Sequence, residues 1–141
     1  MQTSRDLVDS AIADEEIRAA ETYRFMEEQK IKKELAPAQW DDLKRALVAE
    51  HERLSKSSRL NLTIEDDGLS ELSIRNNDIG KAMFLKYNPN AVCIQYVLPD
   101  GRNGHFGFQV NRTGTVVQIM DGAVSRMIGE IVLFAFKRIL R

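Results

Sequence analysis

The first 35 residues combine many charges with a sparse set of apolar positions at helical spacing. These apolar positions form one thin stripe: Val8, Ile12, Ala19, Tyr23 and Met26. The spacing predicts a helix from about Ser4 to Leu35. A helix of that length would measure about 45 Å, whereas a compact domain of this size has a radius of gyration of only about 14 Å. We therefore expect the helix either to break near Ala19-Ala20 and fold back, or to project and meet a partner.

A second helix is predicted from Pro37 to about Lys56. Proline is tolerated in the first turn of a helix but not in its interior, so Pro37 is expected to end the first helix and begin the second. Apolar residues recur on one side of this segment, at Trp40, Leu43, Leu47 and Leu54. Such a stripe is typical of a helix that packs on a core, and we expect Trp40 to anchor it.

From residue 59 onward apolar and polar residues alternate, which is typical of β-strands with one buried face. Turn signals separate the alternating runs: Asp66-Asp67-Gly68, Asn88-Pro89-Asn90, Pro99-Asp100-Gly101 and Asn111 to Gly114. Links as short as these join antiparallel neighbours. We therefore predict an antiparallel meander of about six strands over residues 59–120.

The end of the chain, residues 121–141, is predicted to form a helix with Asp121 as its N-cap. Most of this helix is apolar, and its polar residues fall on one narrow line: Arg126, Glu130, Lys137 and Arg141. One sheet can cover only one side of such a helix, so an earlier helix or a second subunit should cover another. The chain is thus predicted to be a single α+β domain over residues 1–141. It has two N-terminal helices in a helical segment (1–58), the meander (59–120) and a C-terminal helix packed on the sheet.

Composition excludes several classes of protein. The net charge is −1, so the chain lacks the basic footprint of a nucleic-acid-binding protein. The longest apolar run, from Ile131 to Phe136, is too short to span a bilayer, and we expect no membrane partner. Cys93 is the single cysteine, and the N-terminus does not resemble a secretory leader. We therefore expect a cytoplasmic protein.

Candidate chemistry is scarce. His51, Cys93 and His105 do not sit at the spacing of metal ligands, and we expect neither a metal nor a cofactor. Cys93 and His105 are predicted to lie on adjacent strands and on the same face, where a nucleophile and its base could meet. A half-buried cysteine is more often a plain core residue, however. We therefore expect no catalytic residue and lean against an enzyme.

One face of the predicted sheet has few charges. It carries amides together with apolar groups, and the candidate contact residues on it are Phe84, Cys93, Gln95, His105, Gln109, Asn111 and Gln118. A freely solvated sheet face normally mixes threonine with lysine and glutamate, so this composition indicates a face that is covered by a helix, a second sheet or a ligand. The grouping assumes that no bulge intervenes near Gly107.

These patterns favour a non-catalytic protein-interaction module that forms a homodimer. The first helix and the uncharged sheet face would be its contact surfaces. The alternative is a small-molecule-binding domain or simple enzyme, with a pocket between the sheet and the helices. The candidate lining of that pocket is Gln95, Tyr96, His105 and Gln109.

Overall fold

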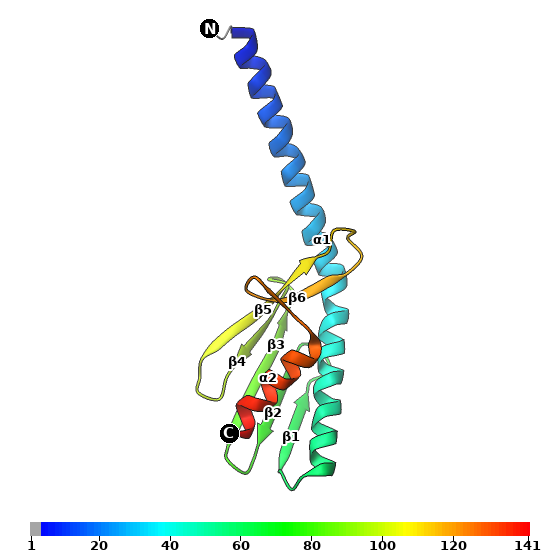
Figure 1. Ribbon diagram of the computed structural model, residues 1–141, viewed down its shortest axis with the longest axis vertical. Coiled ribbons are helices and arrows are strands. Elements are labelled where there is room, and N and C mark those ends of the chain that lie inside the picture. The colour runs from blue at the N-terminus through cyan, green and yellow to red at the C-terminus, as the bar shows by residue number, and fades with distance from the viewer. Residues whose placement is uncertain (1–3) are drawn as a thin grey trace.

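The computed structural model describes residues 4–141, and its largest element is one long helix. Helix α1 (Ser4–Ser57) has 54 residues, which corresponds to a length of about 81 Å. Its second half lies beside the sheet, and its first half extends beyond it (Figure 1). The prediction of two N-terminal helices was therefore wrong, because α1 continues through Pro37.

The continuity of α1 at Pro37 has a local explanation. A proline inside a helix removes one backbone hydrogen bond and typically costs about 3 kcal/mol. Pro37 is exposed, so water can reach the carbonyl of Lys33 that loses its donor. The residues on either side are held in place, since Ala36 is buried and the side chain of Gln39 donates to the carbonyl of Val117 at 3.1 Å. The projecting part of α1 leans away from the line of the part beside the sheet (Figure 1), as expected for a kink at proline.

The sheet is a single antiparallel meander in which each strand pairs with the next. Its strands are β1 (Leu62–Asp66), β2 (Glu71–Asn76), β3 (Lys81–Asn88), β4 (Cys93–Val97), β5 (Asn103–Val110), β6 (Val117–Asp121) and β7 (Val124–Arg126). The antiparallel meander is confirmed, and it has seven strands where about six were predicted. Short turns between neighbours account for this order.

Both helices cover the same face of the sheet. In β3 the side chains of Met83, Leu85 and Tyr87 are buried while those between them are exposed. Helix α2 (Ile128–Leu140) contacts β2 and β3 on the buried face, and α1 contacts β1, β5, β6 and α2. The C-terminal helix packed on the sheet is therefore confirmed. Its second apolar side is covered by α1 within the same chain, so it does not need a second subunit.

The beginning of α2 differs from the prediction. Asp121 is not an N-cap but the last residue of β6, and it pairs with Val124 of β7. Gly122 has a φ of +61°, as in the first position of a type II′ hairpin turn. The N-cap of α2 is Met127, whose backbone N–H donates to the Glu130 carboxylate at 3.1 Å. Residues 121–126 thus belong to the sheet rather than to the C-terminal helix.

The two outer strands of the sheet are protected in different ways. Helix α1 lies alongside β1 (Figure 1), and Nε2 of His51 is 2.8 Å from the carbonyl oxygen of Leu62. An imidazole N–H is therefore able to satisfy an outward-facing backbone acceptor. At the opposite edge, β7 has only three residues.

Candidate interaction surfaces

The projecting segment, defined here as residues 4–28, is exposed at every position. Its 25 residues correspond to about 37 Å of helix. The upper half of Figure 1 shows this part of α1 extending beyond the sheet. Seven large apolar side chains on it are each 50–68% exposed: Leu7, Val8, Ile12, Ile17, Tyr23, Phe25 and Met26. Single exposed apolar residues are ordinary, but this many on one isolated helix mark a surface that can bind another protein.

The projecting segment is also strongly acidic. It carries eight acidic and three basic residues, a net charge of −5. Within residues 4–141, neither Asp14 with Arg18 nor Glu28 with Lys32 forms an ion pair, although each couple has the favourable spacing of four residues. Isolated helices are marginally stable in water. Because this segment has neither packing nor these ion pairs to support it, an intermolecular contact would stabilise it.

The predicted contact face of the sheet is open within one chain. Strand pairing places Gln95 opposite His105 and Gln109 opposite Gln118, and all four side chains are exposed. Phe84 lies on the same face, opposite Val97, and is 48% exposed. Helix α2 packs on the opposite face, and Gln29 and Lys32 of α1 border this one beside Cys93, Gln95 and His105. The exposed side chains show that the described part of the chain covers little of the face.

Two of the predicted positions need a separate description. Asn111 lies in the loop after β5, where its amide donates to Thr113 and Thr115. Its side chain orders this loop rather than extending the sheet face. Tyr96 is on the buried side of the sheet, where its ring packs edge-on against Phe134 of α2 with 5.6 Å between centroids. Gln95 and His105 line one concavity together with Gln29 and Lys32 of α1, whereas Tyr96 packs on the other side of the sheet.

Cys93 and His105 do come close to each other. Because Gln95 pairs with His105, Cys93 lies two residues from the position opposite the imidazole, and both residues line one concavity of about 420 Å³. Burial raises the pKa of the Cys93 thiol, which leaves less thiolate at neutral pH. An activated nucleophile requires the opposite change. This environment favours a structural cysteine.

A groove on the open sheet face has a volume of about 570 Å³. Acidic residues are prominent in its lining, which comprises Glu65, Asp66, Asp67, Glu71, Leu72, Ser73, Phe84, Leu85, Lys86, Gln95, Tyr96 and Val97. The exposed side chains of Phe84 and Val97 supply apolar surface. Lys86 lies 3.6 Å from Glu71, so its charge offsets part of the negative charge. The groove has the size of a ligand site.

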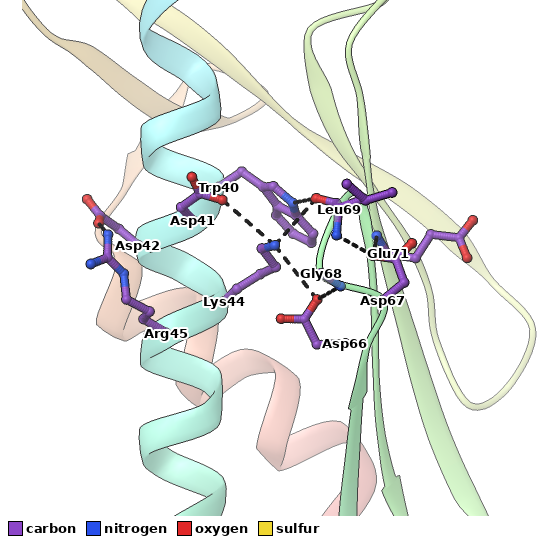
Figure 2. A network of polar contacts seen from close by, with 10 residues as sticks. All are labelled: Trp40, Asp41, Asp42, Lys44, Arg45, Asp66, Asp67, Gly68, Leu69 and Glu71. Atoms are coloured by element: carbon purple, nitrogen blue, oxygen red, sulfur yellow. Dashed lines mark hydrogen bonds and ion pairs between the residues drawn. The ribbon is translucent and has the colours of Figure 1, made fainter.

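A polar cluster next to this groove fixes the turn between β1 and β2 to α1. Nε1 of Trp40 donates to the carbonyl of Leu69 at 3.3 Å, and Nζ of Lys44 lies 3.4 Å from the same oxygen (Figure 2). Lys44 is only 8% exposed, and it lies 3.7 Å from both Asp41 and Asp66. The buried ammonium is thus paired on both sides, as a charge removed from water requires.

The turn itself is ordered by two carboxylates. The backbone N–H groups of Glu71 and Leu69 donate to Asp67 at 3.0 and 2.8 Å and hold the pKa of its carboxyl below the ordinary value. Asp66 accepts from the N–H of Gly68 at 2.8 Å. The Leu69 side chain is nevertheless 78% exposed. Sequence reasoning missed this cluster, although Lys44 stands four residues after Trp40 and would have been placed beside it on a helix.

No group of three or more histidine, cysteine, aspartate or glutamate residues within residues 4–141 could hold a metal ion. No helix in the same range is long and apolar enough to cross a membrane.

Comparison with known proteins gives no relative. No protein-family model, curated protein or solved structure matches this chain.

Proposed function

We propose that this protein is a non-catalytic interaction module that forms a homodimer through the projecting segment. The observation that carries the proposal is the run of 25 exposed helical residues with seven large apolar side chains. Burying apolar surface contributes about 25 cal/mol per Å², and a symmetric dimer is the commonest way for one kind of chain to do so. A cytoplasmic location belongs to the same proposal and is supported by the single cysteine.

The open sheet face is the second contact surface in this proposal. Its amides and exposed apolar groups, with Phe84 and Val97 at 48% and 40% exposure, would suit a protein partner. Helix α2 packs on the opposite face, and α1 borders this one at Gln29 and Lys32, so a partner bound there would leave residues 4–28 free for the helical contact.

The experiment that tests the proposal measures molecular mass by sedimentation over a range of protein concentrations. The full chain should sediment as a dimer at tens of micromolar, and a chain that lacks residues 1–28 should sediment as a monomer. Ile12→Gln removes an apolar group from the predicted stripe and should weaken the dimer. Ile17→Gln is the matched control, because Ile17 is 56% exposed but lies about 140° around the helix from Ile12.

Two results would contradict the proposal. A full chain that remains a monomer at several hundred micromolar would exclude self-association at any relevant strength. A shortened chain that remains a dimer would remove the projecting segment from the interface.

A small-molecule-binding function is the second candidate, and the groove of about 570 Å³ favours it. Its acidic residues, among them Glu65, Asp66 and Asp67, suit a cationic ligand with an apolar part that packs on Phe84. Screening cationic amphipathic compounds by the rise in melting temperature would test it, with Phe84→Ala as the variant expected to lose the effect. The absence of any rise at millimolar ligand would count against this function.

A further inference from the structure

Charges are distributed unevenly along the exposed part of α1. Residues 6–16 carry five acidic residues and no basic residue, whereas residues 30–33, at the base of the projecting segment, carry three lysines and no acidic residue. In the described chain, none of the charged side chains from Asp9 to Lys33 makes an ion pair. Helix α1 therefore has an acidic stretch from Asp9 to Glu16 and a lysine-rich stretch at residues 30–33, and a second helix of opposite direction would complement both.

We infer that two copies pair antiparallel through these helices, with the two-fold axis near Ala19 and Ala20. The inference rests on the proposed function and specifies its interface. In an antiparallel pair centred there, the numbers of two facing residues add up to about 39. Asp9 then faces Lys30 of the other copy, and residues 6–16 face residues 23–33, which carry four basic and two acidic residues. A parallel pair in register would instead place the acidic run of one chain beside the same acidic run of the other chain, where like charges repel.

The apolar residues agree with this register. Ile12, Ala19 and Met26 recur every seven residues, which is the repeat of a coiled-coil seam. In the antiparallel register Ile12 faces residue 27 of the other copy, beside its Met26. Ala19 and Ala20 are the smallest side chains at the centre, so the two helix axes can approach closely there.

The shape of the molecule leaves room for this pairing. The overlap from residue 6 to residue 33 would be about 42 Å long, and residues 6–28 of that stretch stand clear of the sheet (Figure 1). Each N-terminal end would reach the base of the other projecting segment. The two sheets would then lie at opposite ends of the pair.

Disulfide cross-linking in the full chain tests the direction of pairing. With Cys93→Ala as the background, Ala19→Cys is near the two-fold axis and should form disulfide-linked dimers on mild oxidation. Ile12→Cys alone should not, because its copies are then far apart. A mixture of Ile12→Cys chains with Met26→Cys chains should yield the mixed disulfide. Sedimentation of each reduced variant verifies that it still dimerises.

A charge exchange provides an independent test. Asp9→Lys and Lys30→Asp should each raise the dissociation constant of the dimer about three- to tenfold, since each removes two symmetric contacts at the surface. The double variant should restore it. Added salt should weaken the unmodified dimer, because it screens attraction between opposite charges.

The possible results separate this inference from the proposed function. Rapid self-cross-linking of Ile12→Cys would establish a parallel pair and overturn the inference while leaving self-association intact. A dimer in which none of these cysteines cross-links, and in which the charge variants behave like the unmodified chain, would also overturn it. A monomeric full chain would overturn both.

Discussion

Trp40→Ala should lower the free energy of unfolding by about 3–5 kcal/mol, the usual cost of removing a buried tryptophan. Trp40 is 2% exposed, and its ring stacks on Tyr87 with 6.4 Å between centroids and 20° between planes. Truncation would leave a cavity between α1 and the sheet. Lys44 would also lose the ring that its ammonium faces at 5.6 Å.

The contribution of the Trp40 hydrogen bond to the free energy of unfolding can be separated from the contribution of packing. Trp40→Phe keeps much of the ring but loses the bond to the Leu69 carbonyl, which is worth about 1 kcal/mol. Lys44 also lies near that carbonyl, so the oxygen keeps a donor. Trp40→Phe should therefore cost only about 1–2 kcal/mol, most of it from the imperfect fit of the smaller ring.

Urea titration of the variants at one protein concentration measures these differences from the midpoint and the slope of each transition. Leu69→Ala is the matched control, since its side chain is 78% exposed and its backbone carbonyl is retained. It should change stability by less than about 0.5 kcal/mol. A loss below 1 kcal/mol for Trp40→Ala would refute the argument that this residue anchors α1 to the sheet.

Three further variants or conditions have defined outcomes. A thiol reagent should label Cys93 slowly in the native protein and faster as pH rises, because burial raises the pKa of its thiol; labelling as fast as that of a free thiol would contradict this. The pKa of Asp67 is lower in the folded protein than its ordinary value of 3.8, so its contribution to stability is present above that value and is lost as pH falls through the lowered value. In urea titrations below about pH 4, the free energy of unfolding of Asp67→Asn should fall less steeply with pH than that of the unmodified chain. An equally steep fall would count against the role of this carboxylate in the turn. Pro37→Ala should stabilise α1 by up to about 3 kcal/mol by restoring a backbone hydrogen bond, and a loss of stability would show that the kink is needed for packing.

Alternation and turn chemistry predicted the sheet well because both signals are local. Each run from residue 62 to 121 ends at a turn residue that permits only a short link, so antiparallel order followed. Asp121-Gly122 carries the same hairpin signal as Asp67-Gly68. It was interpreted as a helix start because the apolar run after it is long, and this hid strand β7.

The continuity of α1 could not be predicted from sequence, because it depends on tertiary packing. Pro37 is a local signal to stop, whereas the contacts of Ala36 and Gln39 with the body of the protein are visible only in three dimensions. The candidate face was predicted as a set of side chains that share one side of the sheet. The exposure of this face was not predicted, because alternation does not show on which face of the sheet the helices pack. Leu7, Ile17 and Phe25 were missed because they lie off the main stripe.

The treatment of the sheet edges determines what kind of assembly this chain can form. Strand pairing between copies would be open-ended, since each added copy exposes a new edge. Here His51 and α1 occupy the β1 edge, and the β7 edge is too short to template a partner. Two copies can therefore contact each other through α1 or through the open sheet face. A two-fold dimer uses the same surface on both copies and leaves no copy of that surface unpaired. Assembly should therefore stop at a defined stoichiometry, and a rise in concentration should saturate it rather than produce fibres.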